Sequence, residues 1–360
     1  MKQFLIFACV FSLFFFACAS GPRYLPGQDT FYVKAGGSDR NDGLSPETPF
    51  RSLFKALAAA AKGTIKTITV LGTLDEASEQ SSNRERVFLI QSMGKNEILI
   101  RGTPSAGEPA VLSAAGSGRR AVLIRGNSPI RFEHIVISGG VSSGEGGGIG
   151  IAPGCTVILG PGAVIRDNKS DNIGGGIAVF RGGTCTLSGG TIYGNTAGLA
   201  GGGVVVIQSG TFIMEEGVVR ENKTSGSGGG FALLGGGALV FKNGEINSNS
   251  AGEHGGGIAA DTESAITVEG GFISANTAAI WGGGVFTAGP FQKTGGKIYG
   301  NDVPKDQANT AVLGPAVFIY QWDRTYKVRE KSAGEDLILD ASADDGWDIE
   351  EDEENEEDEE

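Results

Sequence analysis

The stretch GGFISANTAAIWGGGVF, Gly270 to Phe286, separates an Asn from a Gly triplet by five residues, and the pattern recurs along the chain. Gly triplets return every 27 or 28 residues, and the same five-residue gap precedes each triplet after the first. The triplets begin at Gly146, Gly174, Gly201, Gly228, Gly255 and Gly282, and the Asn residues are Asn168, Asn195, Asn222, Asn249, Asn276 and, after a shorter interval, Asn301. Such regularity indicates a solenoid of stacked coils.

Apolar residues recur at fixed places within each repeat. The residue after each triplet and the residue two positions later are mostly apolar, which is strand spacing. A second column lies ten residues before each Asn and contains Ile158, Cys185, Phe212, Leu239 and Ile266. A third column lies three residues before each Asn and contains Ile165, Ile192, Val219, Ile246, Ile273 and Ile298. The pattern predicts an all-β fold, a single-stranded right-handed parallel β-helix of three sheets with coils of about 27 residues.

The Asn and Gly columns fit structural roles. Asn tolerates a left-handed backbone at a corner, and its amide can bond the same amide one coil away, so we expect the six Asn residues to form a ladder. The triplets permit positive φ angles and close approach between coils. A phosphate-binding role would need a strand-to-helix transition, which the pattern lacks.

The N-terminus, MKQFLIFACVFSLFFFACAS, combines Lys2 with an apolar run that is too short to span a membrane. We interpret residues 1–17 as a signal peptide. The run ends at Ala17-Cys18 and resembles the lipobox of bacterial lipoproteins, although Phe15 stands where that motif usually has Leu. The resemblance implies an acylated Cys18, a lipidated linker over 18–30, and a protein anchored in the bacterial cell envelope, at the outer membrane or cell surface. The alternative is a secreted protein that is cut nearby.

Residues 31–61, FYVKAGGSDRNDGLSPETPFRSLFKALAAAA, resemble the segment that closes the core in secreted pectate-lyase-like β-helix proteins. Thr48 is the expected N-cap of a short helix with Pro49 in its first turn, and its apolar face would be Phe50, Leu53, Leu57 and Ala61. Asp39, Asn41 and Asp42 fit an Asx-rich turn better than a calcium loop. We therefore expect an N-terminal cap over 31–63 and the β-helix over 64–343.

The repeats between 146 and 301 resemble those of the chlamydial polymorphic membrane proteins, with Gly for the Ala of Gly-Gly-Ala-Ile and mostly Ile for the Phe of Phe-x-x-Asn. That resemblance implies adhesion, host interaction or a structural role in the envelope, without catalysis. The family ends in a translocating barrel, whereas residues 344–360 are acidic and are expected to be disordered. Surface display would therefore depend on the lipid.

The alternative function is a polysaccharide lyase or glycoside hydrolase of the same fold. Asp261 and Glu263 are close in sequence, but no carboxylates correspond to them one coil away, and we interpret them as surface charges. GEHGGG at 252–257 matches only one part of the polygalacturonase motif set, and His134 fits a structural role. We expect no catalytic residue, metal or cofactor.

Charge argues against nucleic acid as a partner. The net charge is −13, and the tail alone holds 13 carboxylates, which leaves 29 acidic and 29 basic side chains elsewhere.

A partner surface is suggested by side chains that alternation sends outward. Phe180, Val205, Ile207 and Leu234, with Ala178 and Ala232, would form an apolar outer face. The segment 316–343, a second copy, or a host surface protein could cover it, and the oligomeric state stays open. Tyr193 and Tyr299, in one outward column with Arg166 and Arg220, are candidates for stacking on a polysaccharide. Cys155 and Cys185 fit apolar core positions better than a disulfide.

Overall fold

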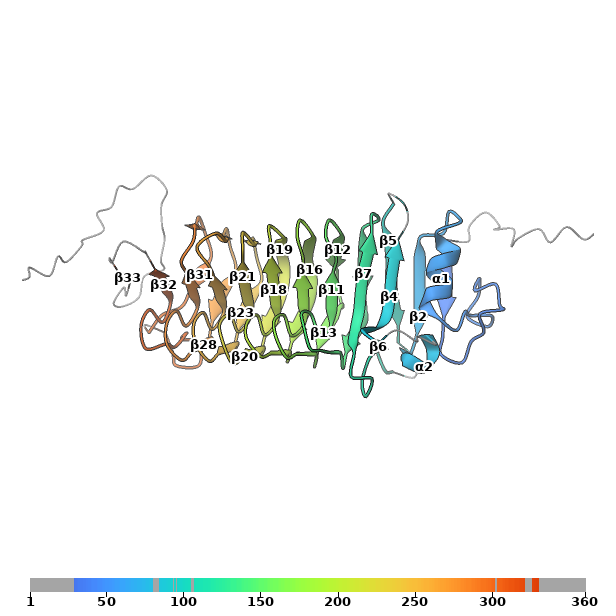
Figure 1. Ribbon diagram of the computed structural model, residues 1–360, viewed down its shortest axis with the longest axis horizontal. Helices are drawn as coiled ribbons and strands as arrows, with labels where there is room; N and C mark the ends of the chain where they lie inside the picture. The colour runs from blue at the N-terminus through green and yellow to red at the C-terminus, as the bar shows by residue number, and fades with distance from the viewer. Residues whose placement is uncertain are drawn as a thin grey trace, which may run out of the picture.

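The computed structural model describes residues 29–79, 84–92, 94, 96–104, 107–301, 303–320 and, for the backbone only, 326–329. The predicted signal peptide, most of the predicted linker with Cys18, and the acidic tail lie outside the described residues. The chain winds into an elongated right-handed parallel β-helix whose strands lie across its long axis (Figure 1). Helix α1 (Leu53–Ala60) lies at one end, and the last two strands lie at the other.

Three sheets build the solenoid within the described residues, as predicted. Sheet A contains β1 (Thr30–Val33), β2 (Thr67–Leu71), β3 (Thr73–Leu74), β5 (Ile98–Thr103), β6 (Ala110–Ser113), β8 (Ile130–Glu133), β9 (Ile135–Ser138), β12 (Thr156–Leu159), β13 (Val164–Arg166), β16 (Thr184–Tyr193), β19 (Thr211–Arg220), β22 (Ala238–Phe241), β23 (Glu245–Asn247), β26 (Ala265–Val268), β27 (Phe272–Ser274), β30 (Phe291–Lys293) and β31 (Lys297–Ile298). Sheet B contains β4 (Arg86–Ser92), β7 (Arg120–Gly126), β11 (Ile149–Ile151), β15 (Ile177–Val179), β18 (Val204–Ile207), β21 (Phe231–Leu234), β25 (Ile258–Ala260), β29 (Val285–Thr287), β32 (Val317–Tyr320) and β33 (Tyr326–Arg329). Sheet C contains β10 (Val141–Ser142), β14 (Lys169–Ser170), β17 (Thr196–Ala197), β20 (Lys223–Thr224), β24 (Ser250–Ala251) and β28 (Thr277–Ala278).

Each regular coil passes through sheet B, then twice through sheet A, then through sheet C. One coil is β15, the two halves of β16, and β17. The prediction of three strands per coil is confirmed for coils such as this one, whereas in other coils sheet A contributes two separate strands, as β12 and β13 do. Neighbouring coils pair in parallel, and β33 pairs with β32 in the antiparallel sense.

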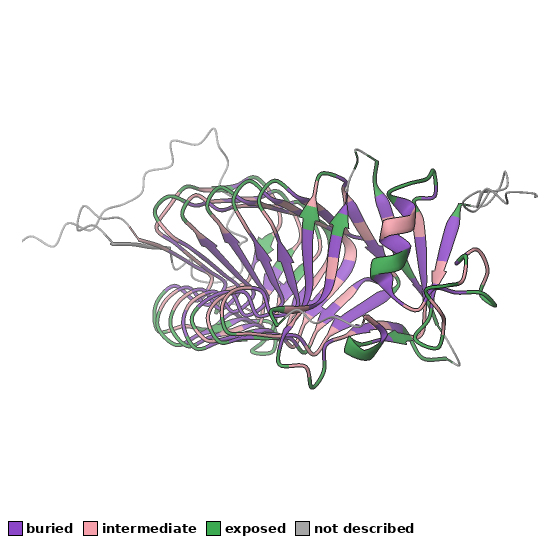
Figure 2. Ribbon diagram, turned by 45° about the vertical axis from the view of Figure 1, so that its right-hand side comes forward, coloured by how far each residue is buried: buried purple, intermediate pink, exposed green. Residues whose placement is uncertain are grey.

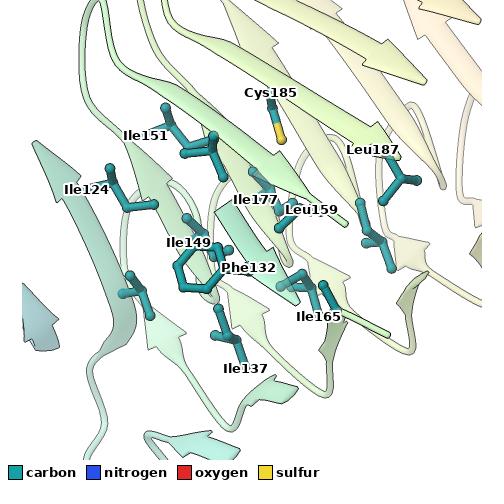
Figure 3. Close-up of a cluster of buried hydrophobic side chains, with 14 of the residues drawn as sticks. Ile124, Phe132, Ile137, Ile149, Ile151, Leu159, Ile165, Ile177, Cys185 and Leu187 are labelled. Carbon is teal, nitrogen blue, oxygen red and sulfur yellow. The ribbon is translucent and has the colours of Figure 1, made fainter. Parts of the chain in front are cut away.

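Inward side chains of all coils form one apolar core. Buried residues follow the strands and exposed residues follow the corners (Figure 2), and Figure 3 shows Ile149, Ile177 and Cys185 among the stacked side chains of that core. The second predicted column begins one residue too late, because Val157 rather than Ile158 pairs with Cys185 and is wholly buried. The corner between β12 and β13 contains Pro161. It is one residue longer than the equivalent corner of the next coil, which lies between Leu187 and Thr191 within β16.

The Asn side chains form a buried ladder from coil to coil. In each step the N–H and Nδ2 of one Asn donate to Oδ1 of the next, as Asn222 does to Asn249 at 3.0 Å and 3.0 Å. Nδ2 also donates to a carbonyl of the preceding coil, Ile192 O for Asn222. The members are Asn168, Asn195, Asn222, Asn249, Asn276 and Asn309.

The assignment of Asn301 to this ladder is wrong. Asn301 is exposed, and Asn309 accepts from the N–H of Asn276 at 2.8 Å in its place. The final corner carries an insertion, so that Thr277 pairs with Thr310 after 33 residues rather than 27.

Each glycine of a triplet meets a different constraint, as Gly201–Gly203 show. Gly201 has a φ of +65°, in the left-handed region. A Cβ on Gly202 would lie 2.6 Å from Gly229 O and 2.6 Å from the Lys223 backbone of the next coil. A Cβ on Gly203 would lie 3.0 Å from the side chain of Asn222. The triplet therefore permits a sharp turn against both the next coil and the ladder.

The N-terminal cap contains the predicted helix, but the helix begins later than expected. Ser52, not Thr48, is the N-cap, with an extended backbone and a hydroxyl that accepts from Lys55 N at 3.1 Å. Pro49 cannot begin the helix because Phe50 is extended and its N–H donates to Tyr32 O. A second short helix, α2 (Glu76–Glu79), packs near the first turn of α1.

Candidate functional site

The outer face of sheet B is the candidate site, and we call it the outer B face. Because strand residues alternate, Ala178, Val205 and Ala232 point away from the core while their neighbours point inward. A second outward column holds Phe180, Ile207 and Leu234, in the same three coils.

The first of these columns is closed by the chain itself. Ala178, Val205 and Ala232 are at most 1% exposed. Residues that precede the Gly triplets, including Ile173 and Ala200, turn back over the sheet and pack against them in a small second core. The prediction that Val205 belongs to an accessible face is therefore wrong, because the turns that carry Ile173 and Ala200 bury it.

The second column keeps part of its apolar surface. Phe180, Ile207 and Leu234 are partly buried and pack against the small second core. Ile207 and Leu234 are direct neighbours in register. These three side chains form a continuous aliphatic and aromatic strip, which we call the apolar strip.

Toward the C-terminal end the outer B face becomes aromatic, which the sequence analysis missed. The imidazole of His254 stacks on Trp281 with ring centroids 4.6 Å apart, and Trp281 stacks on Phe318 at 5.1 Å. Phe286 and Tyr320 extend the stack. His254 and Trp281 occupy the position directly before a Gly triplet, and reading that column would have found them.

The faces of these rings contact one another, and Phe318 is wholly buried. Burial lowers the pKa of His254, while Glu253 acts in the opposite direction. Among the described residues, Nδ1 of His254 is buried without a hydrogen-bond partner. The stack is therefore a packing element of the face rather than an open platform.

Tyr193 and Tyr299 do not form a joint site. The guanidinium of Arg220 lies 4.6 Å from the Tyr193 ring centroid and covers one face of the ring. Tyr299 stacks on Phe272 with centroids 6.3 Å apart. The register places Arg220, Asn247 and Ser274 in the coils between the two tyrosines. Stacking on a sugar stays a prediction for each ring alone.

Of the two carboxylates considered for catalysis, that of Asp261 is engaged in turn contacts. Asp261 accepts from Gly235 N at 2.6 Å and from Glu263 N at 3.2 Å. Glu263 itself is exposed. His134 is exposed at a corner with a φ of +50°, and its N–H donates to Pro161 O. These turn and corner contacts give Asp261 and His134 structural roles.

Two carboxylates from separate segments hold the first turn of α1. Asp39 accepts from Arg51 N, Ser52 N and the Ser52 hydroxyl, and Glu79 accepts from Leu53 N and Phe54 N. Burial raises the pKa of Glu79 to about 7, and the nearby Asp39 adds to the shift.

The predicted Asx-rich turn is confirmed. Asp42 accepts from Leu44 N and the Thr48 hydroxyl, and Asn41 donates to Pro49 O.

Replacing Glu79 with Gln should remove a pH dependence of stability. Because the folded pKa of about 7 exceeds the ordinary 4.5, the contribution of Glu79 to stability is complete below about pH 4.5 and is lost as the pH rises through 7. The free energy of unfolding of the parent, relative to Glu79→Gln, should fall by on the order of 2 kcal/mol over that range. Urea titrations at several pH values measure it, with Glu47→Gln at an exposed site as the charge control. Parallel parent and Glu79→Gln curves would contradict the assignment.

Cys155 and Cys185 are buried and free. Burial raises the pKa of both thiols. Within the described ranges, no group of three His, Cys, Asp or Glu side chains is placed to hold a metal ion. No helix in the described part of the chain is long and apolar enough to cross a membrane.

Comparison with known proteins agrees with this architecture. Residues 90–273, just over half of the chain, match the family described as the right handed beta helix region. Searches of curated proteins and of solved structures gave no match. With its stacked parallel coils and this match, the chain belongs to the right-handed β-helix family.

Proposed function

We propose that this β-helix protein is a lipid-anchored component of the bacterial cell envelope that binds a partner through its side and does not catalyse a reaction. The observation that carries the proposal is the apolar strip of Phe180, Ile207 and Leu234, which stays partly accessible beside the buried column of Ala178, Val205 and Ala232. Accessible apolar surface of this kind is typical of interaction sites.

The composition of the face favours a protein partner over a polysaccharide. Sugar binding commonly needs open aromatic faces beside polar groups, whereas the rings on the outer B face stack on each other. Ile207 and Leu234 offer aliphatic contact only. A host surface protein or another envelope protein with an apolar patch would complement this strip.

The lipid anchor rests on the sequence that ends at Ala17-Cys18. We expect the full chain, expressed in a bacterium that processes lipoproteins, to partition into detergent, because an acyl chain adds favourable membrane affinity. Cys18→Ser should move it to the aqueous phase, as followed by Triton phase separation and blotting. Cys9→Ser, inside the predicted signal, is the matched control and should partition like the parent. Unchanged partitioning of Cys18→Ser would refute the anchor.

The binding role is tested by placing charges on the strip. Ile207→Lys combined with Leu234→Lys should weaken binding at least tenfold in a screen of immobilised host matrix proteins, envelope proteins and glycans. Thr191→Lys with Val218→Lys is the matched control, because these partly buried outward residues of sheet A are neighbours in register. Sedimentation and melting of each variant accompany the screen.

Each outcome has a separate meaning. Lost binding in a folded monomer supports the proposal. Lost self-association would assign the strip to contacts between copies, and lost stability without any binding change would assign it to packing. Turnover of a polysaccharide by the parent protein would replace the proposal with the enzymatic alternative.

A further inference from the structure

Three arginines lie near the N-terminal end of the outer B face, and we call them the arginine cluster: Arg86, Arg120 and Arg125. They belong to β4 and β7, which lie next to each other toward the α1 end of the solenoid (Figure 1). Arg86 and Arg120 are register partners. Arg125 is exposed and follows Ile124 of the core, so its side chain points outward. The charges of Arg86 and Arg125 both act on Arg120.

The guanidinium of Arg120 is held in place over the sheet. Its Nε donates to Gly146 O at 2.8 Å, and its Nη2 donates to Glu145 O. A Cβ on Gly150 would lie 3.0 Å from Nη1 and 3.1 Å from Cζ of Arg120. Gly150 pairs with the outward residue Ala178, so the guanidinium lies on the outer surface of the sheet. A cation fixed in this way loses little conformational entropy when it binds a ligand.

The arginine cluster holds more positive than negative charge. Burial lowers the pKa of Arg120, and the charges of Arg86 and Arg125 lower it further, while Glu145 and Glu85 act in the opposite direction. Three cations and two carboxylates leave an excess of one positive charge. Glu85 lies 3.5 Å from Arg86, whereas in the described part of the chain neither Arg120 nor Arg125 forms an ion pair. A bound anion would relieve the repulsion between the guanidiniums.

Arg125 belongs to the same outward column as the apolar strip. The residues that precede Arg125, Ala152 and Phe180 pair in register from coil to coil, so these three follow one another along the column. Ile207 and Leu234 continue it. Two coil spacings separate Arg125 from Phe180, which is about 10 Å. A single ligand can therefore contact both the exposed cation and the strip.

We propose that the arginine cluster and the apolar strip together bind an acidic protein segment, in which a Glu or Asp carboxylate lies about 10 Å from a group of apolar side chains. The planar guanidinium matches the two oxygens of a carboxylate, and the strip supplies contact for the apolar side chains. About seven residues of a helix, or three of an extended chain, span this distance.

The combination of charge and apolar surface favours a protein segment. An acidic polysaccharide would pair with the arginines but would leave Phe180, Ile207 and Leu234 without an apolar partner. Complementary charge beside an apolar contact is what sets the register and orientation of a protein partner. The inference rests on the proposed function, because it gives the chemistry of the partner that the strip would bind.

Phage display of random twelve-residue peptides on the immobilised full chain tests the inference. Peptides selected by the parent should be enriched in both acidic and aliphatic residues relative to the unselected library. One such peptide, synthesised with a fluorophore, should bind Arg125→Glu at least tenfold more weakly than the parent in an anisotropy titration. Arg101→Glu makes the same charge change at an exposed arginine of sheet A and should bind like the parent. Thermal melting confirms that both variants are folded.

The outcomes separate this inference from the proposed function. Selected peptides without acidic enrichment, or equal affinity of Arg125→Glu and the parent, would overturn the role of the arginine cluster. If Ile207→Lys with Leu234→Lys still abolishes peptide binding in that case, the strip remains a binding site without the arginines. If no acidic peptide is selected and the parent binds polygalacturonate or phosphatidylglycerol vesicles instead, the partner is a polysaccharide or a membrane, and the inference is wrong.

Discussion

Asn222→Ala is expected to lower the free energy of unfolding by about 3 kcal/mol. The side chain makes four buried hydrogen bonds. Its Nδ2 donates to Ile192 O and to Asn249 Oδ1, each at 3.0 Å, and its Oδ1 accepts from the N–H and Nδ2 of Asn195 at 3.0 and 2.9 Å. Alanine would fill less space and leave these partners without their bonds in a site closed to water.

The control for this prediction comes from the same residue type. Asn301→Ala removes an exposed amide outside the ladder and should change stability by less than about 0.5 kcal/mol. Asn309→Ala removes the last rung and should be costly. Because a solenoid can unfold in parts, urea titrations need two spectroscopic probes. If Asn222→Ala unfolds with the same free energy as the parent, or if Asn301→Ala lowers that free energy by as much as Asn222→Ala does, the ladder is excluded as a source of stability.

The regular part of the fold could be predicted because each coil solves the same packing problem. An inward residue such as Val204 or Phe231 must be apolar in every coil, so its column shows in the sequence. The Asn ladder can be recognised in the sequence for the same reason, since each Asn needs an Asn in the next coil. Where a corner changes length, as at Pro161 or before Asn309, counting residues assigns the wrong member.

The candidate site was harder to predict because it depends on contacts between columns. Alternation correctly sends Val205 outward, but only the folded turns show that Ile173 and Ala200 bury it. In the same way, His254 and Trp281 are separated by a whole coil in the sequence and stack only because the turns align them. Sequence periodicity gives the direction of a side chain, whereas its exposure depends on what returns over it.

Gly202→Ala should have the largest effect, a loss of at least about 4 kcal/mol or failure to fold. The added Cβ would lie 2.6 Å from Gly229 O and from the C and N atoms of Lys223, all of them backbone of the next coil. Those atoms cannot move aside without shifting Asn222, which precedes Lys223 and is fixed by its ladder bonds. The clash therefore has to separate two coils.

Substitutions at two other glycines show whether lack of space or backbone conformation is responsible for the loss of stability in Gly202→Ala. Gly36→Ala, where no atom lies within 4 Å and φ is not positive, should be within about 0.5 kcal/mol of the parent. Gly182→Ala, with φ +62° and equally open surroundings, should cost about 1 kcal/mol for the left-handed backbone alone. Urea titration and expression yield compare the three variants. If Gly202→Ala costs no more than Gly182→Ala, the coils have room to separate, and the triplet is selected only for its turn.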